Sequence, residues 1–240
     1  IFLGNLFQQM YNTADSLIVG NFLGSNALAA VSSSGSLIFL LIGFLSGIAI
    51  GAGVVISRYF GARDDENVQI AIHTTAAFGL VAGVLMTLVG VLLSPQILVW
   101  MGTPDAVMDE SLTYLQIYFM GSLGSVMYNI FVGTLQAMGD SKHPLYYLIA
   151  SSIVNVVLDI LFIAVFHAGV GGAALATIIS QFLSAFLCMF RLMKNKGCEK
   201  LYLRKIRFNW EMLKQIVRFG LPSGIQNSII ALANVVVQSN

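Results

Sequence analysis

The chain has 240 residues, of which 57% are hydrophobic and 10% are charged, and its formal net charge is +1. Soluble globular domains carry about 25% charged residues, so this composition excludes that class and favours an all-α polytopic membrane protein. The near-neutral charge gives no reason to expect a nucleic-acid partner. Membrane lipid is the expected surrounding.

Seven apolar runs predict membrane-spanning helices, each close to the ~20 residues that cross the hydrocarbon core. They cover residues 1–22, 34–57, 69–93, 108–137, 144–166, 171–192 and 219–240. Six are complete, and the end of the chain cuts the seventh. Because Ile1 already lies in an apolar run, we expect a fragment truncated at both ends.

Basic residues predict the topology. All twelve Lys and Arg fall at the end of, or in the connection after, the second, fourth and sixth predicted helices: Arg58, Arg63, Lys142, Arg191, Lys194, Lys196, Lys200, Arg204, Lys205, Arg207, Lys214 and Arg218. The connections at 23–33, 94–107 and 167–170 have none. Positive charge stays on the cytoplasmic side, so the N-terminus is expected there, in a bacterial plasma (inner) membrane.

Asp15 and Asp159 lie inside predicted spans, where a carboxylate costs roughly 2.5 kcal/mol or more. Such residues more often serve a pathway or ligand than packing. Helical rise puts both about 10 Å below the outer end, with Asn155 one turn from Asp159 and Thr177 about 9 Å inside. We therefore expect an oxygen-rich pocket for Na+ or a shared proton, formed by Asp15, Asn155, Asp159 and Thr177.

Each member has a simpler explanation when taken alone. Asn155 can form an interhelical hydrogen bond, and the Thr177 hydroxyl can bond back to its own helix. Either Asp15 or Asp159 can reach the outer interface. The presence of two carboxylates at the same depth in the membrane is harder to explain by side chains that reach the interface.

Four further polar residues are candidates for lining a substrate cavity: Gln9, Asn12, Tyr114 and Tyr118. Polar side chains in a membrane helix face a water-filled cavity more readily than lipid. Interfacial anchoring explains Tyr114 nearly as well.

Small residues predict a close helix contact. Gly43, Gly47 and Gly51 recur every four residues on one helix, which is typical of a tight interhelical face. His73 and His167 lie near predicted helix ends, and for both we expect a solvated or headgroup position.

A weak internal repeat divides the chain. Superimposing the run 219–240 on 1–22 places Asn227 on Gln8 and Asn234 on Asp15. Both runs start on the same predicted side, as a parallel repeat requires. We therefore expect three parts: a six-helix lobe at 1–192, a basic cytoplasmic linker at 193–218 with a surface amphipathic helix, and the start of a second lobe at 219–240.

Six stretches in chain order carry a resemblance to a known family. They are 4–15 (GNLFQQMYNTAD), 57–62 (SRYFGA), 133–144 (GTLQAMGDSKHP), 155–159 (NVVLD), 171–177 (GGAALAT) and 220–224 (GLPSG). Across its whole length, the chain resembles the multidrug and toxic compound extrusion family, known as MATE.

The resemblance implies a monomeric twelve-helix antiporter with two six-helix lobes, of which this chain is the first. Such proteins export small organic, often cationic, compounds against an inward flow of H+ or Na+ and need no other cofactor. It also implies that cation coupling falls on Asp15, Asn155, Asp159 and Thr177, where Na+ is a candidate metal.

Three other classes of membrane protein fit the sequence less well. A lipid-linked oligosaccharide flippase shares the superfamily, but it would need a cationic cavity, and no Lys or Arg lies in the interior of a predicted span, since Arg191 is in the last turn of the run 171–192. A membrane aspartyl protease would need a Gly-x-Gly-Asp motif, which is absent from the sequence. A structural or channel-like bundle would need neither carboxylate. We therefore expect a transporter and not an enzyme.

Overall fold

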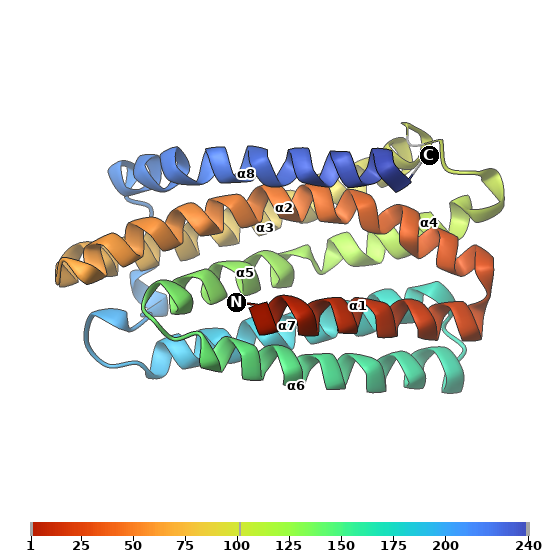
Figure 1. Cartoon of the computed structure of the whole chain (residues 1–240), viewed down its shortest axis with the longest axis horizontal. Coiled ribbons are helices and arrows are strands. Elements are labelled where there is room, and N and C mark those ends of the chain that lie inside the picture. Colours follow the sequence, from red (N-terminus) through yellow and green to blue (C-terminus); the bar gives the residue numbers. More distant parts are fainter. Residues whose placement is uncertain (1, 101, 239–240) are drawn as a thin grey trace.

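The computed structural model describes residues 2–100 and 102–238, without the side chains of 2–12, 25–26, 30, 32–37, 39–42, 44 and 231–238. The described chain is helical and contains no strand, which confirms the all-α class (Figure 1). Its elements are α1 (Phe2–Leu23), α2 (Ser25–Gly61), α3 (Asp65–Trp100), α4 (Asp105–Met120), α5 (Ser122–Ala137), α6 (Lys142–Asp159), the π-helix η1 (Ile160–Val165), α7 (Gly169–Lys194), the 3₁₀ turns η2 (Gly197–Glu199) and η3 (Leu203–Lys205), and α8 (Trp210–Gln238).

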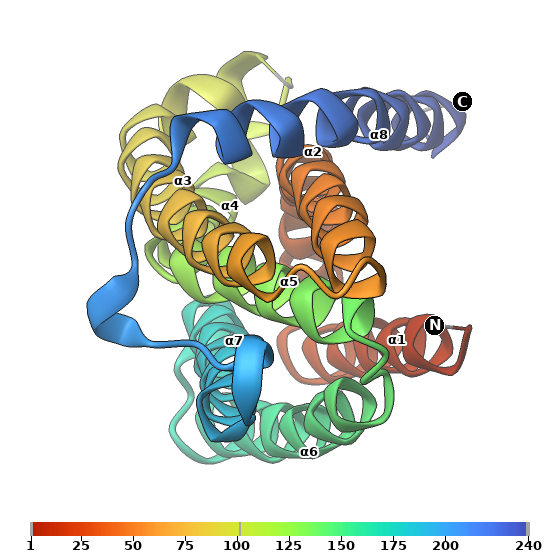
Figure 2. The same cartoon turned by 90° about the vertical axis from the view of Figure 1, so that its left-hand side faces the viewer.

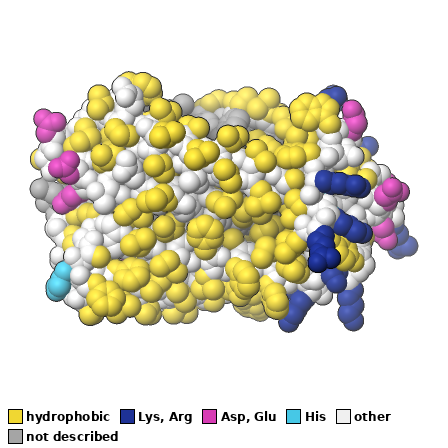
Figure 3. Space-filling view, turned by 180° about the vertical axis from the view of Figure 1, so that it is seen from behind, with side chains coloured by type: hydrophobic (Ala, Val, Ile, Leu, Met, Phe, Trp, Pro, Cys, Tyr) yellow, Lys and Arg dark blue, Asp and Glu magenta, His cyan; other side chains and the backbone are white. Residues whose placement is uncertain are grey.

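Apolar side chains cover the middle of one face of the bundle. Among the described residues, three helices are long and apolar enough to cross a membrane: Asp65–Trp100, Lys142–Val165 and Gly169–Lys194. The pair α4 and α5 makes a fourth if it is counted as one bent span. Figure 3 shows hydrophobic side chains over the middle of one face, with charged side chains at its two ends. This distribution suits a protein surrounded by lipid.

Basic side chains gather at one end of the face in Figure 3. The connections 62–64, 138–141 and 195–209 all lie at one end of the long axis in Figure 1, as the charge pattern predicts. We call this the basic end. That it faces the cytoplasm stays a prediction.

The predicted glycine face on α2 packs against α8. A methyl group on Gly47 would collide with the backbone of Gly224, and one on Gly51 would collide with the backbone of Gly220. Gly43 lies opposite Asn227, whose side-chain amide donates a 3.4 Å hydrogen bond to the Gly43 carbonyl. The predicted close contact is confirmed, and the structure identifies α8 as its partner.

The predicted helix at 108–137 is two helices, α4 and α5, bent by 50°. The bend falls at Gly121, where a Cβ atom would overlap the side chain of Ile178 on α7. A glycine is needed because α7 presses directly against the chain there. From this bend α5 runs through the middle of the bundle, in contact with α2, α3 and α7 (Figure 2).

Two helix starts differ from the sequence-based expectation. The expected connection 23–33 is mostly helix, because α2 begins at Ser25 after a turn at Gly24 with φ 89°. The amphipathic segment expected at the end of the linker is helical, but it is continuous with the following apolar run, because α8 runs without a break from Trp210. Met212 and Ile216 bury one face of that first part against the bundle, so the amphipathic segment continues into the apolar one.

The expectation of a solvated His73 is also wrong. Its side chain is 4% exposed, and its Nε2 accepts a 3.0 Å hydrogen bond from the Tyr202 backbone N–H. Its Nδ1 lies 2.7 Å from the Gln69 carbonyl oxygen, which makes Nδ1 the donor. Gln69 in turn donates to the Cys198 and Lys200 carbonyls. These bonds tie the linker to α3. His167, in contrast, is exposed as expected.

Candidate functional site

Three helices that are distant in sequence bring the candidate coupling residues together. α1 packs against α6 and α7 on one side of the bundle (Figure 2). α1 contributes Asp15, α6 ends with Asn155 and Asp159, and α7 contributes Thr177 near its start. Because Asn155 and Asp159 are four residues apart, they share one face of α6.

The carboxyl groups of Asp15 and Asp159 lie within hydrogen-bonding reach of one another. Asp15 is 8% exposed and Asp159 is 0% exposed, so neither points into the lipid. A hydrogen bond between two carboxyl groups requires a proton on one of them, and two negative charges this close in a buried site repel strongly. The pair is therefore suited to hold a proton or another cation.

Asn155 links the acidic pair to α7. In the amide orientation that satisfies its neighbours, Asn155 donates a 2.9 Å hydrogen bond to Asp159 Oδ2. Its carbonyl oxygen accepts a 3.3 Å bond from the Thr177 backbone N–H. The Thr177 hydroxyl donates to the Ala173 carbonyl of its own helix at 3.0 Å. Thr177 thus contacts Asn155 through its backbone, and its hydroxyl oxygen keeps lone pairs that can accept or coordinate.

Two buried oxygens in the site have no hydrogen-bond partner in the described part of the chain: Asp15 Oδ1 and Asp159 Oδ1. Buried polar atoms are usually paired, so these two oxygens are noteworthy, and a carboxylate oxygen of this kind can accept a hydrogen bond or coordinate a cation. The described residues contain no cluster of three or more His, Cys, Asp or Glu for a metal ion. A Na+ ion would instead draw on two carboxylates with amide and hydroxyl oxygens, which suit a hard cation.

The backbone changes its winding directly beyond Asp159. Residues 160–165 form the π-helix η1, and the Phe166 N–H donates to the Leu161 carbonyl at 3.0 Å. Single π turns inside helices are frequent at functional sites. No sequence signal predicts this turn, because the run from Ile160 to Val165 is uniformly apolar.

The four predicted cavity residues divide into two groups. Tyr114 and Tyr118 are buried in the cluster that packs around Val19 and Phe119, with their rings stacked 6.2 Å apart. Tyr118 lies close enough to Asp15 to sense its charge. Gln9 and Asn12 lie on α1, but their side chains are outside the described set.

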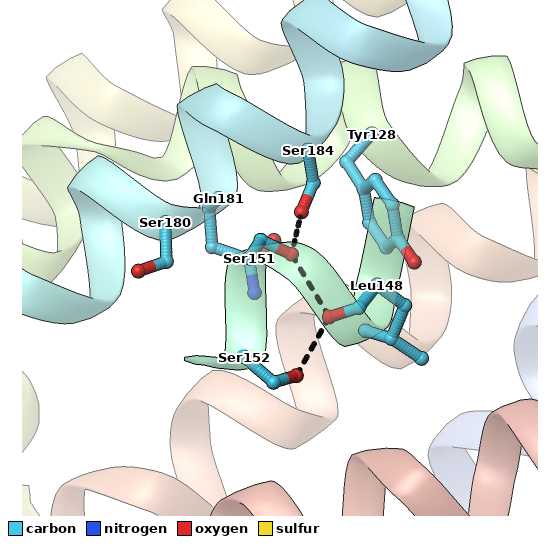
Figure 4. A pocket seen from close by; sticks show the side chains of 7 residues that line it. All are labelled: Tyr128, Leu148, Ser151, Ser152, Ser180, Gln181 and Ser184. Carbon is cyan, nitrogen blue, oxygen red and sulfur yellow. Dashed lines mark hydrogen bonds between the residues drawn. The ribbon is translucent and has the colours of Figure 1, made fainter. Parts of the chain in front are cut away.

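A polar pocket that the sequence reasoning missed lies between α5, α6 and α7. Its free volume is only about 10 Å³, roughly the space of one water molecule. It is lined by Tyr128, Leu148, Ser151, Ser152, Ser180, Gln181 and Ser184 (Figure 4). The Ser184 hydroxyl donates to the Ser151 hydroxyl across the α6–α7 contact. Ser151 lies one turn from Asn155, so extending the same four-residue spacing would have found it.

At the basic end, an ionic cluster joins the start of α6 to the end of α7. Asp140, in the turn before α6, accepts hydrogen bonds from His143 Nδ1 at 2.8 Å and from Arg191 Nε at 3.1 Å. Partial burial raises the pKa of the Asp140 carboxyl, but the bonds from His143 and Arg191 outweigh it, and the pKa lies below its ordinary value.

Comparisons with known proteins give a consistent result. The MatE family model matches residues 1–161. The chain is 32% identical over 246 residues to the probable multidrug resistance protein YoeA of Bacillus subtilis (strain 168), covering 100% of this chain and 53% of YoeA. A solved outward-facing structure of a multidrug resistance MATE family transporter is 28% identical with a TM-score of 0.89, covering 99% of this chain and 52% of that chain. An inward-facing structure is 29% identical with a TM-score of 0.87, covering 94% and 51%. The chain thus spans about half the length of the relatives it matches.

Proposed function

Because the chain belongs to the MATE family of multidrug efflux transporters, we propose that it forms the first lobe of a cation-coupled antiporter. The transporter exports small organic, often cationic, compounds in exchange for an inward flow of H+ or Na+. It works as a monomer in a bacterial inner membrane, with the basic end of the bundle facing the cytoplasm, where positive charge is retained.

One observation carries this proposal: the buried carboxyl groups of Asp15 and Asp159 meet, and each has an oxygen without a partner in the described part of the chain. They lie on α1 and α6, far from the Lys and Arg side chains at the basic end. An uncompensated buried charge is costly, so the pair favours taking up a cation. An acidic site of this kind does not suit the pyrophosphate of a lipid-linked oligosaccharide, which argues against the flippase alternative.

The mechanism follows from the cost of burying charge. With the cavity open to the outside, Asp15 and Asp159 take up H+ or Na+, and the neutral pair can then be closed off from water at a lower free-energy cost. Binding shifts the protein between two arrangements, so that cation entry and drug release share one equilibrium. The existence of outward-facing and inward-facing structures among similar transporters supports such an alternation.

The test is drug-dye efflux from proteoliposomes that contain the whole transporter, first under an imposed pH gradient and then under an imposed Na+ gradient. The gradient that drives efflux identifies the coupling ion. Asp15→Asn and Asp159→Asn should each abolish gradient-driven efflux, because an amide cannot take up a proton or supply a negative charge. Asp109→Asn is the matched control, since Asp109 is an exposed acid on α4. Normal drug resistance from the Asp15→Asn variant would refute the assignment.

A further inference from the structure

The segment that joins α7 to α8 carries an excess of positive charge at the basic end. Residues 194–210, which we call the basic strap, contain one acidic side chain, Glu199, and six basic ones: Lys194, Lys196, Lys200, Arg204, Lys205 and Arg207. Within the described part of the chain, none of these six forms a salt bridge. The basic strap therefore presents positive charge that the described residues do not neutralise.

The inner side of the basic strap is fastened to α3. Leu201 is buried, and the Tyr202 backbone N–H donates to His73 at 3.0 Å. Gln69 donates to two backbone carbonyls of the basic strap, at 2.6 and 2.9 Å. These bonds hold the backbone against the bundle, so the outward side chains start from fixed positions.

The outer side of the basic strap exposes large apolar and aromatic side chains among the basic ones. Trp210 is 66% exposed, and Leu203 and Phe208 are about half exposed. Exposed apolar side chains that are grouped together mark a surface that binds something. Aromatic rings interspersed with Lys and Arg are typical of the membrane interface, where the rings lie at the level of the lipid headgroups.

α7 leads its exposed apolar surface directly to the basic strap. Phe182, Phe186 and Phe190 are exposed and four residues apart, so they form one stripe along the helix. The stripe ends one turn before Lys194, whose ammonium group lies 4.5 Å from the centre of the Phe190 ring. A lysine that lies over the last ring of an apolar stripe has the position of a side chain reaching from hydrocarbon to the headgroups.

α3 places the other end of the basic strap at a similar level. The Asn209 backbone N–H donates to the Thr74 hydroxyl oxygen at 3.3 Å. Leu80 is the first exposed large apolar side chain of α3, and it lies about 9 Å beyond Thr74 along the helix axis. The headgroup region is about 5–7 Å thick on each side of the bilayer, and long basic side chains span the remaining distance. The basic strap thus lies at the level of the headgroups.

Two cations of the basic strap converge on one aromatic ring. The Lys200 and Lys205 ammonium groups lie 5.2 and 4.8 Å from the centre of the Tyr202 ring, so they are no more than about 10 Å apart. The Tyr202 ring itself stacks on His73, which holds it against α3. Two like charges at this separation repel, and an anion between them removes the repulsion. A phosphate group has the charge and the acceptor oxygens to bind both ammonium groups.

We propose that the basic strap binds the phosphate headgroups of anionic phospholipid, with Lys200, Tyr202 and Lys205 at the centre of the site. The inference rests on the part of the proposed function that turns the basic end to the cytoplasmic leaflet. Anionic lipid holds the outer side of the basic strap, while the bonds from α3 hold its inner side. The lipid thereby stabilises the docked position of the segment that connects the first lobe to α8.

The position of the basic strap favours lipid over the second lobe as its partner. Figure 2, which looks onto the basic end, shows the basic strap running along the outside of α3, on the opposite side of the bundle from α1. α1 carries Asp15, so the cavity of the proposed transporter adjoins α1. Figure 3 shows basic side chains at the basic end bordering the hydrophobic surface, as headgroup-binding residues should.

The experiment titrates the whole transporter, purified in a neutral detergent, with phosphatidylglycerol and with phosphatidylcholine. Native mass spectrometry counts the bound lipids and gives both affinities. Each Lys or Arg near an anionic lipid surface contributes about fivefold in affinity. The wild type should therefore bind phosphatidylglycerol at least about tenfold more tightly than phosphatidylcholine, and added salt should reduce this preference.

The double variant Lys200→Gln/Lys205→Gln should lose the preference, because it removes both ammonium groups. Lys200→Arg/Lys205→Arg keeps both charges and should retain it. The single variant Lys205→Gln, at an exposed side chain, should weaken phosphatidylglycerol binding about fivefold, and it tests the site even if the double variant does not purify. Lys142→Gln/Lys214→Gln is the matched control, since it removes two exposed charges from the basic end outside the basic strap.

Equal affinity of the wild type for the two lipids would overturn the proposal, and so would an unchanged preference in Lys205→Gln and the double variant. Equal losses in the double variant and the control would assign binding to net charge alone. Displacement of phosphatidylglycerol by millimolar inorganic phosphate would show a free-anion site and overturn the lipid assignment. Dye efflux tests the antiporter separately: lipid preference without gradient-driven efflux would overturn the transport proposal and leave the lipid surface standing.

Discussion

The backbone contact between α2 and α8 makes a strong prediction about four glycines on one helix. Gly47→Ala places a methyl group against the Gly224 backbone and 2.8 Å from the Ser223 carbonyl carbon, whereas ordinary contacts begin at 3.4 Å. Gly51→Ala places one 2.5 Å from the Ile216 carbonyl oxygen. Both neighbours are backbone atoms, which cannot turn away as a flexible side chain can.

The expected magnitude combines two opposing effects. Replacing a helical glycine by alanine gains up to about 1 kcal/mol in helix propensity. Overpacking a tight contact costs typically 1–3 kcal/mol, because α8 must move away by about 1 Å and lose contacts along its length. Gly47→Ala and Gly51→Ala should therefore destabilise the contact. Gly53→Ala should be neutral or stabilising, since its methyl group would meet the nearest atom at 3.6 Å.

The assay is the fraction of detergent-solubilised transporter that survives heating as a monodisperse peak. Gly47→Ala and Gly51→Ala should lower the midpoint temperature, while Gly53→Ala and Gly61→Ala should not, because nothing lies within 4 Å of a methyl group at Gly61. Equal midpoints for all four variants would show that α2 and α8 do not pack backbone against backbone.

Two further predictions concern the basic end. The pKa of Asp140 is lowered in the folded protein by His143 and Arg191, so its stabilisation is complete above the unfolded pKa of about 3.9 and is lost as pH falls through the folded value. The stability difference between wild type and Asp140→Asn, measured by thermal unfolding, should therefore be constant at neutral pH and shrink below about pH 4; a difference that grew on acidification would contradict this sign. His73→Ala should lower stability by about 1–3 kcal/mol in denaturant unfolding, because it leaves the Tyr202 N–H without its acceptor, whereas the exposed His167→Ala should change little.

The acidic site was predictable from the sequence because its depth depends only on the helix orientation and the helical rise per residue. Basic residues fix which helix ends share a side, and the 1.5 Å rise per residue then sets the level of Asp15, Asp159 and Thr177. The structure brings these residues together with Asn155. Their role in cation coupling stays a prediction, since proximity alone does not assign that role.

Features that depend on contacts between distant elements were not predictable. His73 lies near a predicted helix end, as an interfacial histidine does. It becomes a buried hydrogen-bond acceptor only because the linker folds back over it and places the Tyr202 N–H against its ring. Gly121 has no distinguishing sequence context, and the bend there follows from the pressure of Ile178 on α7. The start of α8 at Trp210 likewise depends on a surface that buries Met212.

The polar pocket between α5, α6 and α7 was partly predictable from the sequence. Its four-residue spacing from Asn155 and Asp159 was present in the sequence at Ser151, but a membrane serine that bonds to its own helix gives the same pattern. Ser151 does donate to the Tyr147 carbonyl at 2.8 Å, so its bonds within α6 are those of an ordinary helix serine and do not identify it as a pocket residue. The distinction comes from outside α6, where Ser184 donates to Ser151 and Tyr128 borders the same space. A helix face acquires its chemistry from the helices that cover it.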